Sequence, residues 1–517
     1  MIVVFHENNK VVQIYDYSNN QEIDIALDAI QETLVLLAIK NTSQFIGWCH
    51  ESLKEDLNLT KWNSILKHPL LLVSFETSDH FYMTSDIGYI EDTPFINVNK
   101  NVSYPTWFMS SDVGVIHASV LLKFEYLLKY KLAFDLFLNM IAKVGMKQGL
   151  LCYSNPNLLI DASKKRVITK KNISSTNFLW FVKSNYRYRW ILLYLLNLSI
   201  HNKKFLIFPF LRVLFKKSIK NKISFDNIKL KEYKKLIGPS IDVLIPTLGR
   251  EKYLKDVLLD LANQTILPKK VIIIEQNPIE NELSKLDFLN EPWPFEIDHT
   301  IIYQLGACNA RNIGLSKVSS DWVFFADDDV RFNSTLLEDG FKYLNLYQTV
   351  AICLSCLQKN EIENHNNVFQ SATFGSGTSI VKSTALKDVK FDRAYEFGYG
   401  EDADFGMQLR NTGTDILYVP FVKILHLKAL IGGFRKKMIR KWEKEAILPK
   451  PSPTIMVYKL KYATKEQLQS YKTTLFLKFY KNQPIINPLS YYKQFQKALD
   501  KSKYWATNLI NKESNEI

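Results

Sequence analysis

The sequence predicts an α/β fold, a mostly parallel sheet with helices on its faces, for the second half of this 517-residue chain. Continuous apolar runs alternate with amphipathic segments between residues 241 and 330, and Pro or Gly residues punctuate them. Apolar runs of this kind are typical of strands that are buried on both faces of a parallel sheet. A content of 47% hydrophobic and 13% aromatic residues indicates a folded protein rather than a disordered one.

Each predicted element follows from its own pattern. The helix after the first strand, for example, has apolar residues at Leu254, Val257, Leu258 and Leu261, which lie on one helical face. In order, the predicted elements are strands over 241–246, 269–276, 299–304 and 321–329, with helices over 251–263 and 309–318. Ligands collect at the carboxyl ends of the strands in such sheets, so candidate site residues are sought there.

The length allows two or three domains. We expect an N-terminal α/β lobe over 1–162, a basic, aromatic, helical linker over 163–237, the α/β domain described above over 238–435, and a helical C-terminal extension over 436–517.

The positive charge is concentrated between residues 163 and 237. This stretch has 19 Lys and Arg against Asp226 and Glu232, a balance of 19 − 2 = +17, whereas the whole chain carries +14, so the remainder sums to 14 − 17 = −3. Aromatic and aliphatic residues are interleaved with the cations, so we expect residues 178–222 to lie on an anionic membrane surface, in two pieces separated at Pro209. The alternatives are a solvated linker face, a core joining two lobes, and a nucleic-acid surface. We expect no nucleic acid, because no nucleic-acid-binding motif is recognised.

Neither a signal peptide nor a membrane span is expected. The N-terminus lacks a basic region followed by an apolar core, and no apolar stretch reaches the roughly 18 residues that a span requires. The cysteines are few and scattered, and the C-x-x-C of Cys353 and Cys356 lies in an apolar run, which favours buried thiols over a zinc or redox site. We therefore expect a cytoplasmic protein, peripheral on the inner face of the membrane.

Three consecutive carboxylates, Asp327, Asp328 and Asp329, follow the apolar strand WVFFA. They repel one another and lose hydration at the end of a strand, so they need a compensating cation. The alternate residues Asp327 and Asp329 can converge on one hard divalent ion, while Asp328 points toward a hydroxyl or a backbone amide. An acidic strand-to-helix turn with no ligand is the alternative.

Polar residues also follow the other predicted strands, as a nucleotide pocket requires. The turn from Pro246 through Thr247 to Arg250 can hold ribose or phosphate, and Glu275 can accept a hydrogen bond from a base. Arg311, in a helix that opens with small residues, offers a fork of donors to phosphate. A salt bridge from Arg311 to the Asp triplet is the alternative.

Two further sites come later in the chain. Glu401, Asp402 and Asp404 precede or begin a helical segment, where a carboxylate can serve as a general base or simply cap the helix. His426 ends a short strand after Pro420; a lone His is more often structural, and a nearby metal would reverse that preference.

Taken in order, these motifs resemble those of the family 2 glycosyltransferases, which have the GT-A fold. The resemblance covers about residues 240–430 and rests on IDVLIPTLGR, VIIIEQNP, LGACNARNIGL, WVFFADDDV, FGSGTSIVKS and FGYGEDADFGMQLRNTG. Glu275 stands where that family usually has an Asp.

The resemblance implies metal-dependent, inverting transfer of a sugar from a nucleotide-sugar donor to a glycan or lipid-linked acceptor in surface polysaccharide synthesis. It implies that Mn²⁺ or Mg²⁺ is held by Asp327, Asp329 and His426, and that Asp402, beside Glu401, is the base. The implied donor-binding residues are Pro246, Thr247, Arg250, Glu275, Arg311, Asp327 and Asp328, and the acceptor-side residues are Gly375, Gly377 and Asp404.

The N-terminal lobe resembles a degenerate copy of the same fold. Residues 41–52 can be aligned with 319–330, which places Trp48 at Ala326, and residues 110–121 can be aligned with 375–386. Asp135 survives in the stretch that parallels the helix after Glu401, but the Asp triplet does not. An unrelated α/β accessory domain is the alternative here. For the whole chain, the rival function is a non-catalytic nucleotide-sugar-binding or scaffold subunit of a glycan-assembly complex.

Overall fold

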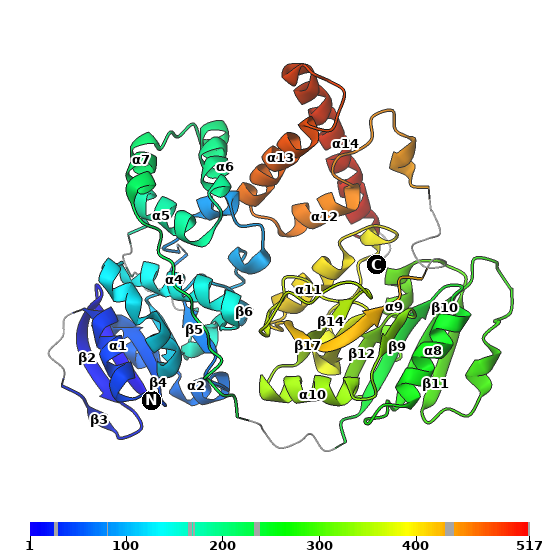
Figure 1. The fold of residues 1–517 in the computed structure, drawn as a ribbon, viewed down its shortest axis with the longest axis horizontal. Coiled ribbons are helices and arrows are strands. Elements are labelled where there is room, and N and C mark those ends of the chain that lie inside the picture. Colours follow the sequence, from blue (N-terminus) through cyan, green and yellow to red (C-terminus); the bar gives the residue numbers. More distant parts are fainter. Residues whose placement is uncertain are drawn as a thin grey trace. The chain divides into compact units, whose positions relative to one another are not determined.

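The computed structural model describes residues 1–24, 29–79, 81–163, 168, 171–231, 238–429 and 439–514. The chain divides into two compact units, each built on its own sheet (Figure 1). Unit 1 consists of Met1–Lys231 and Ala463–Leu475, and unit 2 of Glu232–Tyr462 and Phe476–Ile517. This division differs from the four predicted segments, because the described helices of the basic segment belong to unit 1 and so does part of the expected C-terminal extension.

Unit 2 contains the α/β alternation that the sequence predicts. Its strands are β9 (Ile241–Thr247), β10 (Lys270–Gln276), β11 (Glu296–Ile302), β12 (Trp322–Ala326), β13 (Val330–Phe332), β14 (Ala351–Leu357), β15 (Phe369–Gln370), β16 (Thr378–Lys382) and β17 (Leu417–His426). Its helices are α8 (Glu251–Ala262), α9 (Ala307–Leu315), α10 (Leu336–Leu346), α11 (Glu401–Asn411), α12 (Pro453–Tyr462) and α14 (Pro488–Ser514), and α13 (Lys465–Tyr480) has residues in both units.

The sheet of unit 2 has the order β11-β10-β9-β12-β16-β14-β17-β13, with β15 on β17. The first four strands pair in parallel, as predicted. β9, β10 and β12 are buried, and α9 packs on β9 and β10, whereas β11 at the edge of the sheet is only partly buried. From β12 onward the sheet is mixed: β16 runs antiparallel to β12 and β14. The prediction of a mostly parallel sheet therefore holds for only one half, because short strands such as β16 give no sign of direction in the sequence.

Strand β17 runs through Pro420 instead of beginning after it. Its pairing with β14 shifts register between Leu354 and Ser355, so residues 420–422 have no ladder partner in β14. Such an irregularity accommodates a proline, which cannot donate to the ladder. The strand ends at His426, as expected.

Unit 1 is a second α/β unit. Its strands are β1 (Ile2–Glu7), β2 (Lys10–Asp16), β3 (Gln21–Glu22), β4 (Phe45–His50), β5 (Leu71–Phe75), β6 (Tyr104–Pro105), β7 (Val113–His117) and β8 (Leu151–Ser154). Its helices are α1 (Ile30–Lys40), α2 (Leu59–Ile65), α3 (Ala118–Leu121), α4 (Phe134–Gly145), α5 (Ser175–Asn185), α6 (Arg189–Asn197) and α7 (Ile207–Phe215).

The two sheets share a strand order. The path β1-β4-β7-β5-β8-β6 in unit 1 has the same succession of parallel and antiparallel pairings as β9-β12-β16-β14-β17-β15 in unit 2. An α-helix, α4 in unit 1 and α11 in unit 2, lies between the corresponding last strands in both sequences. This shared order supports the predicted duplication over the alternative of an unrelated lobe.

The predicted alignment of the two copies is wrong by one residue at β4. Trp48 lies opposite Gly114, and Phe325 lies opposite Ser379, which the predicted alignment matches to Gly114. Trp48 therefore corresponds to Phe325 rather than to Ala326. A one-residue slip reverses the face of every side chain, so only the ladder partners fix this register. The positions of the Asp triplet are then occupied by His50, Glu51 and Ser52.

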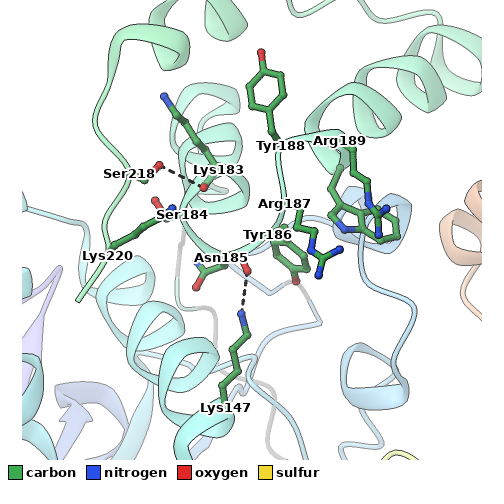
Figure 2. A pocket seen from close by; sticks show the side chains of 11 residues that line it. Lys147, Lys183, Ser184, Asn185, Tyr186, Arg187, Tyr188, Arg189, Ser218 and Lys220 are labelled. Carbon is green, nitrogen blue, oxygen red and sulfur yellow. Dashed lines mark hydrogen bonds between the residues drawn. The ribbon is translucent and has the colours of Figure 1, made fainter. Parts of the chain in front are cut away.

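The basic segment folds as α5, α6 and α7 within unit 1. Through α5 it packs on the rest of the unit. The residues Phe178–Val182 of α5 are buried, so this part is core and not a membrane-facing surface, which corrects the prediction for residues 178–222. Lys183 Nζ donates to the carbonyl oxygens of Val213, Leu214 and Lys216 at the end of α7, and Ser218 Oγ donates to Lys183 O at 3.5 Å (Figure 2).

Pro209 does not separate two helices as predicted. It lies in the first turn of α7, where a backbone N–H would have no intrahelical partner in any case. The chain is instead interrupted at residues 203–206, where Lys203 adopts φ +54°. In the described part of the chain, no helix combines the length and the apolar character needed to cross a bilayer. The five cysteines are free thiols and four of them are buried, including Cys353 of the C-x-x-C.

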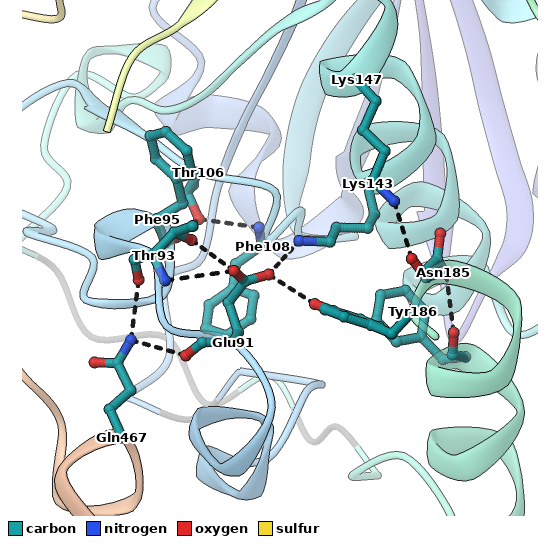
Figure 3. A network of polar contacts seen from close by, with 11 residues as sticks. Glu91, Thr93, Phe95, Thr106, Phe108, Lys143, Lys147, Asn185, Tyr186 and Gln467 are labelled. Atoms are coloured by element: carbon teal, nitrogen blue, oxygen red, sulfur yellow. Dashed lines mark hydrogen bonds and ion pairs between the residues drawn. The ribbon is translucent and has the colours of Figure 1, made fainter. Parts of the chain in front are cut away.

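A buried ion pair between Glu91 and Lys143 lies beside Tyr186, at the end of α5 (Figure 3). Glu91, 5% exposed, accepts hydrogen bonds from Lys143 Nζ, from Tyr186 Oη at 2.7 Å and from Thr93 Oγ1 at 2.8 Å. Gln467 Nε2 donates to Glu91 O at 2.9 Å, which ties residues 463–475 to this unit. Burial alone would raise the pKa of Glu91, but Lys143 and the hydrogen bonds lower it from its usual 4.5 to about 2.

Lys143→Met should destabilise unit 1 by about 3–5 kcal/mol, because it leaves a buried carboxylate without its cation. Hydrogen–deuterium exchange of unit 1 peptides across a urea titration would measure this loss of stability, with the exposed Lys129→Met as control.

Because Glu91 has a depressed pKa, the stability that its ion pair contributes should be complete above pH 4.5 and be lost as the pH falls toward 2. Glu91→Gln should remove that part of the acid sensitivity. Equal stability of Lys143→Met and Lys129→Met would contradict this account of the pair.

Candidate functional site

The acidic turn after β12 is held by residues at the end of the neighbouring strand β9. Asp328, 3% exposed, accepts hydrogen bonds from Thr247 Oγ1 at 2.7 Å and from Arg250 Nη1 at 2.6 Å. We predicted that Asp328 points toward a hydroxyl or a backbone amide, and Thr247 supplies the hydroxyl. Burial raises the pKa of Asp328 to about 6 despite the adjacent Arg250. Pro246 pairs with Ile274 within the sheet, one residue before this contact.

Asp329 is held by a different set of groups. Arg250 Nη1 lies 3.2 Å from Asp329 Oδ2, His426 Nε2 lies 3.6 Å from Oδ1, and the backbone N–H of Ala429 donates to Oδ2 at 2.9 Å. Burial would raise the pKa of Asp329, but His426 and Arg250 hold it below its usual value. The same contact raises the pKa of His426. The structure therefore brings the predicted metal ligands Asp329 and His426 side by side.

Asp327 is the open member of the triplet. Its side chain is 36% exposed, whereas those of Asp328 and Asp329 are 4% exposed. Arg311 Nη2 lies 3.1 Å from Asp327 Oδ1, so the salt bridge posed as an alternative for Arg311 is present. Arg311 is 5% exposed, and its Nε and Nη1 have no hydrogen-bond partner within the described part of the chain. Two buried donors thus remain for an anionic ligand.

Gly377 is required by its distance from Asp327. A Cβ at Gly377 would lie 2.2 Å from Asp327 Oδ2, and one at Gly375 would lie 2.4 Å from Thr378 Oγ1 and 2.6 Å from Cys353 Sγ. Both glycines therefore have a steric reason to be there. Their acceptor-side role stays a prediction.

Helix α11 begins with the Glu401–Asp402 pair beside this turn. Asp402 Oδ1 accepts from the backbone N–H of Ser376 at 3.2 Å, and the Asp402 carbonyl accepts from Phe374 N–H at 3.1 Å. Burial raises the pKa of Asp402, and Arg311 opposes that rise. Burial and the adjacent Asp402 raise the pKa of Glu401 to about 7. Two carboxyls with elevated pKa values at the start of a helix are suited to proton transfer near neutral pH.

Asp404 has a structural position rather than the predicted acceptor-side one. It is fully buried and accepts hydrogen bonds from Tyr395 Oη at 3.1 Å, Tyr462 Oη at 2.9 Å and Gln408 Nε2 at 2.6 Å, with Lys461 Nζ at 3.2 Å. These contacts fasten α11 to α12 and leave no face of the carboxylate open to an acceptor.

Unit 1 retains the counterpart of Asp402. Asp135 is the second residue of α4, as Asp402 is of α11, and its Oδ1 accepts from the backbone N–H of Ser111 at 3.0 Å. Ser111 corresponds to Ser376 in the aligned strands, so Asp135 matches Asp402 rather than Asp404, which the predicted alignment had paired with it. Phe134 occupies the position of Glu401. Unit 1 therefore keeps the counterpart of Asp402, but it has Phe134 in place of Glu401 and no Asp at the positions of the triplet.

The carboxylate of Glu275 is hydrogen-bonded to other side chains of the protein. Its Oε2 accepts from Ser284 Oγ at 2.6 Å and lies 2.8 Å from His299 Nε2. Burial would raise the pKa of Glu275, but these two hydrogen bonds lower it overall. The role of Glu275 in binding a base stays a prediction.

Glu396 is a site residue that the sequence did not reveal. Its carboxylate accepts from the backbone N–H groups of Cys308 at 3.0 Å and Asn309 at 3.0 Å, at the start of α9. Gly306 has φ +148°, and a Cβ there would lie 2.3 Å from the Glu396 carboxyl carbon. The small residues that open α9 thus make room for this acid, which satisfies the exposed N–H groups of the helix. An unexplained acid shortly before the Glu401–Asp402 pair was the only available signal.

The acid triplet is therefore neutralised by the protein's own cations, Arg250, Arg311 and His426. Among the residues that the structure describes, no three His, Cys, Asp or Glu side chains are arranged as a ready metal site. The donor chemistry nevertheless suits a divalent ion, because Asp327 has an exposed carboxylate and Asp329 and His426 face each other beyond hydrogen-bonding distance.

Comparisons with known proteins agree with this arrangement. Residues 242–395 match the model of the family described as Glycosyl transferase family 2. Glycosyltransferase GlyA of Streptococcus pneumoniae serotype 4 is 28% identical over 119 residues, which cover 22% of this chain and 16% of that protein. The matched part is thus under a fifth of the length of that relative.

Two solved structures show weaker overall likeness. Residues 1–349 of Staphylococcus aureus TarS align at 16% identity and TM-score 0.37, over 52% of this chain and 81% of that one. The mannosyltransferase PcManGT of Pyrobaculum calidifontis, solved with GDP-Man and Mn²⁺, aligns at 14% identity and TM-score 0.29, over 54% of this chain and 76% of that one. The family match over residues 242–395, together with the acid turn and the Glu401–Asp402 helix in the expected order, supports the resemblance of this part of the chain to glycosyl transferase family 2.

Proposed function

We propose that this protein is a metal-dependent, inverting glycosyltransferase that transfers a sugar from a nucleotide-sugar donor to a glycan or lipid-linked acceptor in surface polysaccharide synthesis. The observation that carries the proposal is the position of Arg311. It pairs with Asp327 of the acid turn, and its charge also acts on Asp402 and Glu401. One buried guanidinium thus joins the proposed donor side of the site to the proposed base.

The proposed reaction assigns separate tasks to these groups. Asp402 takes the proton of the acceptor hydroxyl as its oxygen attacks the anomeric carbon of the donor sugar. The bond from that carbon to the diphosphate oxygen breaks, and its electron pair leaves with the nucleoside diphosphate. The free donors of Arg311 hold that diphosphate, and Thr247 and Arg250 fix the turn by binding Asp328.

We assign Mn²⁺ or Mg²⁺ to Asp327, Asp329 and His426, which would hold the ion beside the donor's diphosphate. When bound, the ion supplies positive charge that stabilises the leaving group. The acid turn has cations of its own, so the metal is required for the donor rather than for folding.

The metal assignment predicts that EDTA abolishes turnover and that Mn²⁺ or Mg²⁺ restores it. His426→Gln should raise the Mn²⁺ concentration needed for half-maximal turnover by about tenfold or more, because an imidazole ligand is lost. His365→Gln is the matched control, since His365 is exposed and pairs with Glu363 elsewhere in the unit. Turnover that survives EDTA, or unchanged Mn²⁺ dependence in His426→Gln, would show the assignment to be wrong.

The base assignment predicts that Asp402→Asn lowers kcat by roughly 10²–10⁴ with donor affinity retained. The wild-type rate should fall as acid protonates Asp402, at a higher pH than for an ordinary carboxylate, because burial raises its pKa. Single-turnover rates against pH would measure both effects. Asp404→Asn serves as the comparison and should lower thermal stability more than the rate of the folded enzyme. A kcat for Asp402→Asn above about a third of wild type would transfer the role to Glu401.

We also infer that the α6–α7 segment of unit 1 rests on an anionic membrane. Three phenylalanines are largely exposed on and around α7, Phe205 by 72%, Phe208 by 77% and Phe215 by 88%. Residues 203–217 contain five cations and no acid in the sequence. Exposed aromatic side chains bracketed by Lys and Arg suit the headgroup boundary of an anionic bilayer. This location, on the inner face, would bring the enzyme to a lipid-linked acceptor.

The combined variant Phe205→Ser/Phe208→Ser/Phe215→Ser should lose flotation with phosphatidylglycerol vesicles, because the apolar contacts with the acyl boundary are removed. The control variant Val12→Ser/Ile39→Ser/Ile160→Ser changes three exposed apolar residues elsewhere in unit 1 and should float like the wild type. Equal binding of the two variants would refute the assignment of α7 to the membrane.

A further inference from the structure

A basic pocket lies in unit 1 where α5 ends and α6 begins (Figure 2). The cavity has a volume of about 740 Å³. Five of its lining side chains are cationic and none is acidic; the cations are Lys147, Lys183, Arg187, Arg189 and Lys220. The α5–α6 turn contributes most of the wall, and residues 218–220 after α7 close another side.

The wall of this pocket is fixed from behind. Tyr186 donates to the buried Glu91, and Lys147 Nζ donates to Asn185 O at 2.9 Å (Figures 2 and 3). Lys183 uses its hydrogen bonds on the three carbonyls at the end of α7. Lys147 and Lys183 therefore build the pocket and add charge to it, while its backbone stays in place.

Three other cations of the pocket are not neutralised by an acidic side chain among the described residues. Arg187, Arg189 and Lys220 are exposed, and none of them forms an ion pair with any residue that the structure describes. Arg189 lies over the ring of Trp190 at 5.6 Å, which holds its guanidinium at the rim of the pocket. Like charges gathered on one cavity repel one another, and an anion bound among them would relieve that repulsion.

The type of cation indicates the type of anion. Two guanidinium groups present planar forks of donors that match the oxygens of a phosphate group, and Lys220 adds a point charge. The volume is within the usual 300–1,000 Å³ of small-molecule sites, so it has room for a phosphate together with the group that carries it. Tyr188 and Trp190 provide aromatic surface for that group. We propose that this pocket binds a phosphate-bearing ligand and makes unit 1 a non-catalytic binding module.

The phosphate can come from two sources that share this chemistry, a phospholipid headgroup and a soluble phosphate ester. The pocket is separate from the Asp triplet and from Asp402, which belong to unit 2. Its test therefore uses binding rather than turnover, and a negative result leaves the proposed transfer reaction untouched.

The test uses the full chain with Arg187→Gln/Arg189→Gln/Lys220→Gln. This variant breaks no ion pair among the described residues, so it should fold. The matched control Lys40→Gln/Lys61→Gln/Lys131→Gln removes the same charge from exposed positions of unit 1. Calorimetric titration with glycerol 3-phosphate and with pyrophosphate tests the soluble source. Flotation with phosphatidylglycerol and phosphatidylcholine vesicles tests the headgroup.

The pocket variant should bind at least one probe about tenfold or more weaker than the wild type, while the control stays within about twofold. A loss confined to vesicles identifies a headgroup site, and a loss confined to the soluble probes identifies a soluble ester. Failure of the wild type to bind any probe would overturn the proposal. An equal loss in both variants would overturn it as well, because it would show attraction to net charge without a site.

Discussion

The neutralisation of three adjacent carboxylates is the constraint on which the site depends. Asp327, Asp328 and Asp329 follow a fully buried strand, where they would repel one another and lose hydration. Arg250 bridges Asp328 and Asp329, and Arg311 pairs with Asp327. Arg250 lies in the connection between β9 and α8, and Arg311 lies within α9, so the acid turn can keep its shape only when β9, β12 and α9 are packed together.

The same pairs link the fold to chemistry. Arg250 pairs with two buried acids, which largely neutralise its charge within the protein. It therefore acts as a positioning residue. Arg311 is different, since two of its buried donors remain unpaired among the described residues. In the proposed reaction, these unpaired donors, on a guanidinium that pairs with the open carboxylate of Asp327 and also lowers the pKa of Asp402, are assigned to the departing diphosphate.

The two units show what a shared strand order does and does not preserve. Unit 1 keeps Asp135 on the same helix position and backbone contact as Asp402, so this contact is compatible with the fold alone. It has Phe134 in place of Glu401, and His50, Glu51 and Ser52 at the triplet positions. Unit 1 instead carries exposed cations and phenylalanines on helices outside the shared strands. The same fold can support different functions, so a copy without the catalytic residues can still serve in binding.

The sequence by itself determined the βα alternation, the acid turn after WVFFA, the Glu401–Asp402 helix and the second lobe, because these depend on periodicity and neighbouring residues. Tertiary structure decided the rest. The pairing of Arg250 with Asp328, separated by 78 positions, the burial of Asp404 and the capping of α9 by Glu396 depend on which elements meet. The one-residue register of β4 and the burial of α5 were likewise open, since an apolar run has the same pattern whether a core or a membrane covers it.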